Sequence, residues 1–311
     1  MTSNDWYFGL DAGATKTRLY ARSRVGHADL ELLEGAANAL RQGVAQTASV
    51  LSSLINDALD ELPGGTLRAV HAGIAGASAP SIQKELVRRI RLLVNSDSPF
   101  NLTISHDGVI ALEGAFAGQS GLLFISGTGS GVMARTGADI SEVDHVGGWG
   151  HIIGDEGSGY AIGKRALAAV GHAFDGGPKT RLTHLAKRHL NIYDRHSLLS
   201  MIGQSDWKFQ NMAPLALNAA EDGDDIAASV VQEETKLLAR QAELMLKKYP
   251  DLDPRYTIIG GLSNNKFYVN RLCAATENIW PIAKFVAPKA TPAEGAVQIA
   301  MQQSIDSDAV Q

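Results

Sequence analysis

The stretch 8-FGLDAGATKTR-18 combines two glycines with an aspartate, two threonines and a lysine between apolar residues. It does not fit a P-loop, because there the lysine directly follows the last glycine, whereas here Lys16 follows Thr15. The aromatic residues before the stretch and the residues from Thr17 onward favour strands. The stretch therefore predicts a β-hairpin, although the pattern alone also fits an ordinary glycine turn. The predicted tip consists of Asp11, Gly13, Ala14 and Thr15.

The composition limits what the chain can be. With 311 residues, 45% of them apolar, it can bury a large core and form about two domains. Its net charge of −5 argues against nucleic acid or a membrane surface as a partner. Its single cysteine, Cys273, excludes a disulfide framework or a thiolate metal cluster within one chain. The lack of a secretion leader and of a membrane-length apolar run predicts a soluble, cytoplasmic protein.

Three sequence patterns occur twice, in the same order along the chain. The hairpin pattern returns as 122-LLFISGTGSGVMAR-135, where Ser126 takes the place of Asp11. The other two pairs are 69–86 with 256–272, a strand followed by a helix, and 113–118 with 294–300, a helix that begins Glu-Gly-Ala. Three pairs in one order indicate a duplicated fold.

The spacing of the pairs locates an insertion. The hairpins lie about 115 residues apart, whereas the Glu-Gly-Ala helices lie about 180 residues apart. The second half therefore holds an extra, mostly helical segment somewhere between about 155 and 250. This arrangement predicts a first domain over 1–118 and a second over 119–291, with a helix at 292–306 that packs back on the first domain.

Asp107 is a candidate for chemistry. It follows the apolar strand pattern of 102–105 and precedes a helix pattern. An aspartate at the carboxyl end of a strand lies where α/β folds place their ligands. The alternative role is an N-cap of the helix, worth about 1 kcal/mol, and both roles are compatible. The neighbouring His106 is given a structural role.

The segment 147-GGWGHIIGDEGSGYAIG-163 predicts a glycine-rich loop that leads into a helix. Trp149 offers an apolar face and Asp155 a hydrogen-bond acceptor, the combination that a pyranose ring and its hydroxyls require. In the alternative interpretation, Asp155 and Glu156 only stabilise the start of the helix that begins near Ser158.

Together these motifs resemble the sugar kinase, Hsp70 and actin superfamily, within the branch of N-acetylglucosamine kinases and BadF/BadG/BcrA/BcrD-type ATPases. Residues 9–18 and 126–131 resemble its two phosphate motifs, and 258–265 resembles its adenosine motif. The segment 147–163 is similar to the sugar-binding segment of N-acetylglucosamine kinases, which favours the sugar-binding interpretation. The resemblance covers nearly the whole chain and implies an α/β fold, namely a duplicated ribonuclease H-like (actin-like ATPase) two-domain fold.

The resemblance also implies an activity, that of an ATP-dependent amino-sugar kinase acting on the 6-hydroxyl of N-acetylglucosamine. Asp107 is then the general base that takes the proton from this hydroxyl, and Asp11 holds the hydrated Mg²⁺ that accompanies ATP. The residues implied to bind ATP are Gly13, Thr15, Lys16, Gly127, Thr128, Gly129, Gly260 and Gly261. The residues implied to bind the sugar are Asn38, Asp107, Gly148, Trp149, Asp155 and Ser158.

Several alternatives stay open. A glucosamine kinase acts on a substrate that lacks only the acetyl group, and the sequence does not separate the two. A sugar-sensing protein or an ATPase of the same fold without kinase activity is a further alternative. The single cysteine disfavours the zinc loop of ROK proteins and the iron–sulfur cluster of the dehydratase activators. By resemblance to similar kinases we expect a homodimer.

Overall fold

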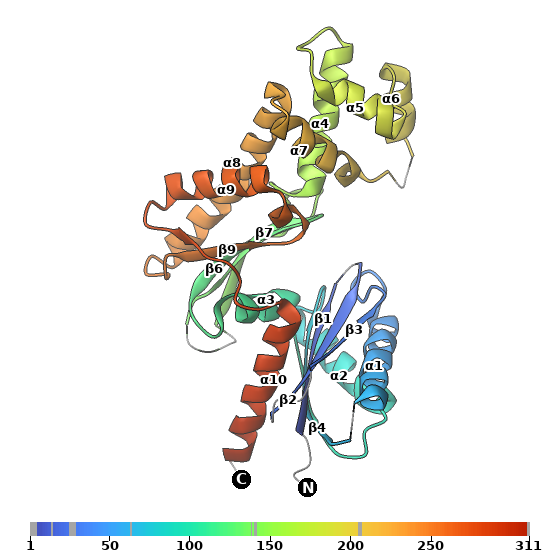
Figure 1. Cartoon of the computed structure of the whole chain (residues 1–311), viewed down its shortest axis with the longest axis vertical. Coiled ribbons are helices and arrows are strands. Elements are labelled where there is room, and N and C mark those ends of the chain that lie inside the picture. Colours follow the sequence, from blue (N-terminus) through green and yellow to red (C-terminus); the bar gives the residue numbers. More distant parts are fainter. Residues whose placement is uncertain are drawn as a thin grey trace. The chain divides into compact units, whose positions relative to one another are not determined.

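The computed structural model describes residues 5–13, 15–24, 29–62, 64–137, 139, 142–204 and 207–309 (Figure 1). Ala14, at the predicted hairpin tip, lies outside these residues. Contacts within the chain divide it into two compact units. Unit 1 comprises Met1–Gln119, Gly137–Glu142 and Ala287–Gln311, and unit 2 comprises Ser120–Thr136 and Val143–Val286.

Unit 1 is built on a mixed five-stranded sheet. Its strands are β1 (Asp5–Ala12), β2 (Thr17–Ser23), β3 (Leu30–Glu34), β4 (Thr66–Ile74) and β5 (Asn101–Ser105). They lie in the order β3-β2-β1-β4-β5, with β1 antiparallel to β2 and parallel to β4. The central strand β1 is buried without interruption from Trp6 to Leu10, as expected for a strand that is covered on both faces.

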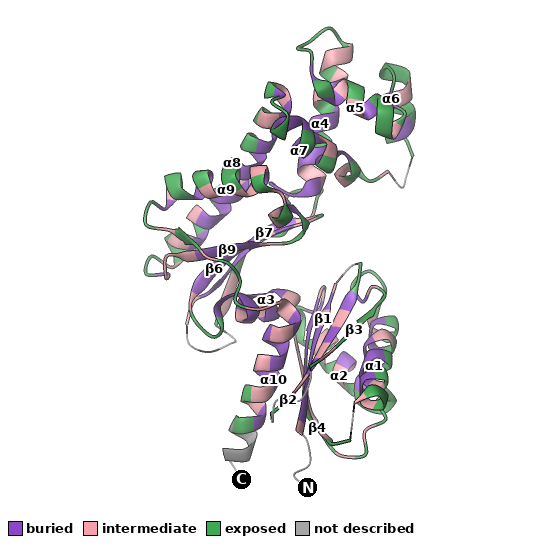
Figure 2. Cartoon of the chain, in the orientation of Figure 1, coloured by how far each residue is buried: buried purple, intermediate pink, exposed green. Residues whose placement is uncertain are grey.

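Helices cover the two faces of this sheet (Figure 1). They are α1 (Val44–Glu61), α2 (Pro80–Leu93), α3 (Asp107–Phe116) and α10 (Pro292–Ala309). Alternate residues of β1 serve opposite faces, because successive side chains of a strand point to opposite sides. Phe8 belongs to the core that includes residues of α1 and α2, whereas Tyr7 packs with Val297 of α10. Figure 2 shows the buried stripes of these helices.

The two Glu-Gly-Ala segments form α3 and the start of α10, and both helices lie in unit 1. They pack against each other at their glycines. A Cβ on Gly114 would lie 2.5 Å from the carbonyl oxygen of Thr291, and one on Gly295 would overlap the backbone of α3 at Ile110 and Gly114. Only glycine therefore permits this close helix crossing.

Unit 2 repeats the sheet of unit 1. Its strands are β6 (Gly121–Ser126), β7 (Ser130–Arg135), β8 (Val143–Gly147), β9 (Arg255–Ile259) and β10 (Lys284–Phe285), in the order β10-β9-β6-β7-β8. Strand β6 is antiparallel to β7 and parallel to β9, as β1 is to β2 and β4. Each strand of unit 1 thus has a counterpart in unit 2, and the predicted duplicated α/β fold is confirmed.

The units differ in the connection that follows their third strand. Between β3 and β4 the described residues form only α1, whereas between β8 and β9 the chain forms several helices. These are α4 (Gly159–Phe174), α5 (Arg181–Leu190), α6 (Arg195–Ile202), α7 (Ala213–Glu221) and α8 (Asp225–Lys248), with the short helix η1 (Phe209–Met212). Strand β9 is followed by η2 (Gly261–Asn264) and α9 (Lys266–Ile279). Among the residues described, no helix is long and apolar enough to cross a membrane.

Candidate active site

The carboxyl ends of three strands of unit 1 lie side by side. Asp11 of β1 pairs with Gly73 of β4, and Gly73 pairs with Ser105 of β5. A Cβ on Gly73 would lie 2.5 Å from the Cδ1 atom of Ile110 in α3, so this glycine lets α3 pack directly on the sheet. Because α3 begins at Asp107, this packing places Asp107 at the sheet edge that carries Asp11.

Asp11 is the carboxylate at this edge whose pKa the environment alters. It lies within β1 opposite Arg18, one residue before the strand ends, rather than in the turn itself. Burial, and then the nearby charge of Asp107, raises the pKa of Asp11 from 3.8 to about 6, against the opposing effect of Arg18 and Lys16. A carboxylate whose charged form is disfavoured by burial and by a neighbouring negative charge is stabilised by a bound cation.

Asp107 is the first residue of α3, and His106 is the N-cap. The Nδ1 atom of His106 lies 3.1 Å from the amide nitrogen of Gly108 and 3.0 Å from Oδ1 of Asp107. With the proton on Nε2, Nδ1 of His106 accepts from the amide of Gly108; with a proton on Nδ1, it donates to the carboxylate of Asp107. The alternative interpretation of Asp107 as the N-cap is therefore wrong, because its neighbour holds that position, although Oδ1 of Asp107 also accepts from Gly108 at 3.1 Å.

A buried histidine lies beneath this edge. His71 of β4 contacts two hydroxyls of β5: its Nδ1 lies 2.7 Å from Oγ1 of Thr103 and its Nε2 lies 3.0 Å from Oγ of Ser105. Thr103 donates onward to Gln303 of α10 at 2.6 Å, and Ser105 to the carbonyl of His106 at 3.1 Å. Burial lowers the pKa of His71 to about 3, so the ring is neutral at physiological pH. Sequence reasoning missed this residue, for which a lone histidine in an apolar strand was the available signal.

The first hairpin closes as a tight turn. The amide of Gly13 donates to the carbonyl of Lys16 at 3.0 Å, and the amide of Ala37 donates to the carbonyl of Gly13 at 3.0 Å. Thr15 and Lys16 are exposed, so their side chains are accessible to a ligand. The turn is thus anchored by its backbone to the segment that precedes Asn38.

Asn38 organises its own loop. Its Oδ1 accepts from the amides of Leu40 and Arg41, at 3.1 and 3.0 Å. Its own amide donates to Oε1 of Gln42 at 3.0 Å. Asn38 is only partly buried, and its carboxamide nitrogen faces no acceptor within hydrogen-bonding distance among the described residues. A donor is therefore available to a ligand beside the unit 1 hairpin.

The second hairpin is held by the helix that follows the glycine-rich loop. Its turn closes with the amide of Gly127 donating to the carbonyl of Gly129 at 2.9 Å. The amides of Gly159 and Tyr160, at the start of α4, donate to the carbonyls of Gly127 and Thr128 at 2.8 and 3.3 Å. These first amides of α4 are thus used within the protein, while the hairpin is fixed in position.

Gly260 and Gly261 lie beside the same hairpin. Gly260 follows β9 with a φ of 99°, a conformation that favours glycine. A Cβ there would overlap the carbonyl of Ser126, so the backbone of the predicted adenosine motif approaches the second phosphate motif directly. A Cβ on Gly261 would meet no described atom within 4 Å, which leaves this face open to a ligand.

In the glycine-rich loop between β8 and α4, Asp155 is buried and Trp149 is exposed. Asp155 is buried with a φ of 64° and accepts from the amides of Ser130 and Gly150. Burial raises the pKa of Asp155 despite these hydrogen bonds. Trp149 is 72% exposed and follows Gly148, whose φ of 70° favours glycine.

Ser158 has a different environment from Trp149. It is fully buried, at 0% exposure, and its Oγ accepts from the amide of Ala161 at 3.1 Å as the N-cap of α4. Ser158 therefore does what the alternative interpretation assigned to Asp155 and Glu156. Its observed role is to start the helix, and direct contact with a sugar stays a prediction.

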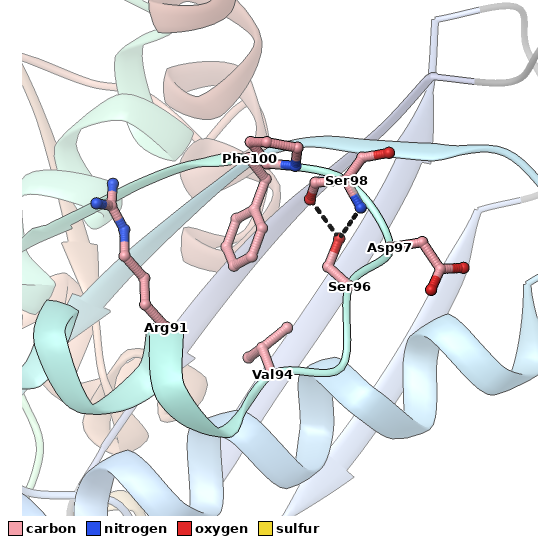
Figure 3. Close-up of a pocket in the computed structure, with 7 residues that line it drawn as sticks. Arg91, Val94, Ser96, Asp97, Ser98 and Phe100 are labelled. Carbon is pink, nitrogen blue, oxygen red and sulfur yellow. Dashed lines mark hydrogen bonds between the residues drawn. The ribbon is translucent and has the colours of Figure 1, made fainter.

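A surface pocket lies elsewhere in unit 1 (Figure 3). It is next to the loop that leads into β5, at the opposite end of this strand from Asp107. In Figure 3 the Oγ of Ser96 bonds to the backbone of Ser98 and shapes the loop. The pocket is lined by Arg91, Val94, Ser96, Asp97, Ser98, Pro99 and Phe100. None of the predicted site residues is among them.

Comparison with known proteins decides the family. Residues 8–300 match the model of the BadF/BadG/BcrA/BcrD ATPase family. The chain belongs to this family. The N-acetylmuramic acid/N-acetylglucosamine kinase of Clostridium acetobutylicum is 30% identical over 96% of this chain and 99% of its own length. The glucosamine kinase of Vibrio cholerae is 29% identical over 74% of this chain and 76% of its own length.

A solved structure of the same type supports the assignment. The crystal structure of a candidate N-acetylglucosamine kinase from Chromobacterium violaceum superposes with a TM-score of 0.74 at 25% identity, covering 94% of this chain and 97% of the other. The predicted BadF/BadG/BcrA/BcrD family is thereby confirmed. In this family member, the predicted residues fall into two local groups, one around Asp11 and Asp107 in unit 1 and one around the second hairpin in unit 2.

Proposed function

We propose that this BadF/BadG/BcrA/BcrD family protein is an ATP-dependent amino-sugar kinase that phosphorylates the 6-hydroxyl of N-acetylglucosamine, with Asp107 as the general base. The observation that carries the proposal is the pair Asp11 and Asp107, which are close enough in unit 1 for one charge to raise the pKa of the other. The kinase of Clostridium acetobutylicum, which is similar over nearly the whole chain, supports the substrate class.

In the proposed reaction, the 6-oxygen of the sugar forms a bond to the γ-phosphorus of ATP while the bond to the β,γ-bridging oxygen breaks. The hydroxyl proton passes to a carboxylate oxygen of Asp107, and ADP leaves. Asp107 is suited to this role because it is partly exposed and lies at the start of α3, beside a carboxyl strand end. Most of the remaining work is positioning and charge neutralisation, as in phosphoryl transfer generally.

We assign Asp11 to Mg²⁺, which supplies charge neutralisation at the phosphates when bound. The described residues contain no group of three or more His, Cys, Asp or Glu side chains that could hold a metal ion. A site that offers one or two carboxylates fits Mg²⁺. This ion keeps several of its waters and is commonly bound through one or two carboxylates and the phosphates of the substrate. A bound cation would also offset the repulsion between Asp11 and Asp107.

The nucleotide is proposed to bind through backbone amides and hydroxyls of the glycine turns. In unit 1 these residues are Gly13, Thr15 and Lys16, and in unit 2 they are Gly127, Thr128, Gly129, Gly260 and Gly261. The exposure of Thr15 and Lys16 and the open face of Gly261 support this assignment. Small residues at such turns let a phosphate or ribose approach the backbone closely.

The sugar is proposed to bind through Asn38 and Asp107 in unit 1 and through the glycine-rich loop in unit 2. The exposed ring of Trp149, next to Gly148, suits contact with a pyranose face or an acetyl methyl group. Asp155 and Ser158 are buried, so we assign them to holding the loop that presents Trp149. A sugar hydroxyl would contact only the accessible part of the Asp155 carboxylate.

Glucosamine is the second candidate substrate, because the similar Vibrio cholerae protein is a glucosamine kinase. The two substrates differ by one acetyl group. A panel of amino sugars tests this directly, with ADP release measured with N-acetylglucosamine, glucosamine, N-acetylmannosamine and 6-deoxy-N-acetylglucosamine. We expect the highest kcat/KM with N-acetylglucosamine, no reaction with the 6-deoxy sugar, and loss of activity with EDTA.

Other results of this panel identify the alternatives. Higher kcat/KM with glucosamine would reassign the substrate within the same activity. Sugar binding without ADP release would indicate a sugar sensor, and ADP release independent of sugar would indicate an ATPase of another role. A homodimer, expected by resemblance, is part of the proposal and is checked by light scattering.

A further inference from the structure

One residue of the glycine-rich loop, Gly157, has both its amide and its carbonyl bonded to buried side chains. The amide of Gly157 donates to Oε2 of Glu234 at 2.8 Å. Its carbonyl accepts from Oη of Tyr268 at 2.7 Å, and Oγ of Ser126 lies 3.1 Å from the same carbonyl oxygen. Ser126 and Tyr268 are 0% exposed and Glu234 is 3% exposed, so water does not compete for these bonds. We call these four residues the Gly157 clamp.

The backbone of Gly157 fits this place because it is glycine. Its φ is 81°, a conformation that other residues rarely adopt. A Cβ there would lie 2.7 Å from the Cβ of Leu238 on α8, so the loop lies directly on this helix. A second contact fixes the same loop, since Gln241 of α8 donates to Oε2 of Glu156 at 2.8 Å.

The clamp connects segments that have different proposed ligands. Ser126 ends β6, and the phosphate turn begins at the next residue, Gly127. Tyr268 lies in the first turn of α9, directly after the Gly260–Asn265 segment proposed for adenosine. Gly157 belongs to the loop proposed for the sugar. All of these residues lie in unit 2, so their contacts belong to one compact body.

The two hydroxyls of the clamp form a directed chain. Oγ of Ser126 and Oη of Tyr268 lie 2.6 Å apart, and each hydroxyl has one proton. Tyr268 donates to the carbonyl of Gly157, so Ser126 can donate to Tyr268, and every group in the chain is then satisfied. Burial raises the pKa of Tyr268, so the phenol keeps its proton at any physiological pH. A shift of either hydroxyl therefore moves the partners of the other.

From this arrangement we infer that Tyr268 is a positioning residue that couples nucleotide binding at the second hairpin to sugar binding at the glycine-rich loop. The inference rests on the proposed function, because it requires a nucleotide and a sugar as ligands. A nucleotide phosphate on the hairpin fixes Ser126, and the hydroxyl chain then fixes Gly157 and the loop that follows Trp149. By linkage the coupling is reciprocal, so the sugar strengthens nucleotide binding by the same factor.

The chain offers a matched control for the removal of this hydroxyl. Tyr256 of β9 is also 0% exposed in unit 2, but its hydroxyl faces the thiol of Cys273 and not the loop. Tyr268→Phe and Tyr256→Phe therefore remove the same buried group, and only the first breaks the Gly157 clamp. Each variant is tested as the full chain, with N-acetylglucosamine and the β,γ-imido analogue of ATP as probes in the presence of Mg²⁺.

The measured quantity is the ratio of the sugar Kd without the ATP analogue to the Kd with it, from calorimetry. We expect this ratio to exceed five in the wild type and in Tyr256→Phe. In Tyr268→Phe it should be at least threefold lower than in the wild type. Ser126→Ala breaks the same chain at its other hydroxyl and should lower the ratio in the same way. The Kd of the ATP analogue, measured with and without sugar, should show the same change.

The outcomes separate the two proposals. A wild type that binds no amino sugar would overturn the proposed function itself. A wild type with a ratio near one, or a Tyr268→Phe variant that keeps the full ratio, would overturn the coupling role and leave the kinase proposal intact. A merely structural Tyr268 would lower the melting temperature of the variant without changing the ratio. If Tyr268→Phe does not fold, Ser126→Ala decides the question by the same measurement.

Discussion

The same place in the repeat is used differently in the two units. Asp11, at the end of β1, is a carboxylate with a raised pKa next to a second carboxylate, Asp107. Its counterpart Ser126, at the end of β6, is fully buried and bonds to Tyr268 and Gly157. One copy thus keeps a charged group available for a ligand, and the other uses the position to hold neighbouring loops together.

The two units also differ in the residues that follow their fifth strands. In unit 1 the fifth strand leads at once to Asp107 and α3. In unit 2 the fifth strand, β10, is followed by 286-VAPKAT-291, which contains no carboxylate, before α10 begins. The ends of the first and fifth strand positions of the repeat thus have a nearby acid in unit 1, Asp11 and Asp107, and none at Ser126 or in 286–291 of unit 2. We therefore expect chemical steps to depend on unit 1 side chains, and unit 2 to contribute binding and positioning.

The largest expected effect is that of Asp107→Asn. Asparagine keeps the shape of the side chain but cannot accept the proton, so we expect kcat to fall by about 10²–10⁴-fold, or about 3–5 kcal/mol of barrier. Sugar affinity by calorimetry should change much less, and the melting temperature little, because His106 caps the helix. Asp97→Asn, an exposed acid at the other end of β5, is the control. Retained turnover in Asp107→Asn would exclude the general-base role.

Of the two exchanges between these repeat positions, Ser126→Asp and Asp11→Ser, only the first should destabilise the protein. Ser126→Asp places a carboxylate in a fully buried site, where it faces the carbonyl of Gly157 without a proton to donate. We expect a loss of about 3–4 kcal/mol in the free energy of unfolding, measured with urea. Asp11→Ser, the reverse exchange, should fold with at least wild-type stability. Equal stability of both variants would mean that the two positions are not specialised in this way.

Asp11→Asn should raise the stability of the protein at pH 8 and lower its activity. Because the pKa of Asp11 is raised from 3.8 to about 6, the native state loses stability as pH rises through about 6, and the full contribution is present only below about 3.8. Removing the charge should therefore raise the free energy of unfolding at pH 8 by about 1–3 kcal/mol, and change it little at pH 4. Mg²⁺-dependent turnover should fall in the same variant. A stability gain that is equal at both pH values would contradict the raised pKa.

Much of the fold could be predicted from local sequence patterns. The hairpins, the strand–helix pairs and the Glu-Gly-Ala helices recur in order, and each pattern arises from short-range preferences for strands, turns and small residues. The order of the strands within each sheet was not predicted and is known from the structure. The close crossing of α3 and α10 at Gly114 and Gly295 became evident only in the structure.

The supporting contacts of the site could not be predicted in this way. The bonds of His71 to Thr103 and of Tyr268 to Gly157 join residues that lie 32 and 111 positions apart. Such pairs depend on strand register and helix packing, which a single sequence does not encode as a local pattern. For the same reason the sequence suggested a cap at Asp107, whereas the register of α3 places His106 there.

The smallest effect we predict concerns Ser105, which links His71 to the residue before Asp107. Its Oγ lies 3.0 Å from Nε2 of His71 and donates to the carbonyl of His106 at 3.1 Å. Ser105→Ala removes both contacts at the point where β5 passes into α3. We expect kcat to fall about tenfold, or about 1.4 kcal/mol of barrier, while KM values for sugar and ATP stay within about twofold.

Thr103→Val is the matched control, because Thr103 contacts the other nitrogen of the same ring but lies two residues farther from the site. Both variants leave one nitrogen of a buried, neutral imidazole without its partner, so both should lower the melting temperature by a similar amount. Only Ser105→Ala should lower kcat, because only Ser105 holds the backbone that presents Asp107. Ser105→Thr keeps the hydroxyl and should restore turnover. If Thr103→Val lowers kcat as much as Ser105→Ala, the effect arises from general loss of stability, and His71 has no directed role at the site.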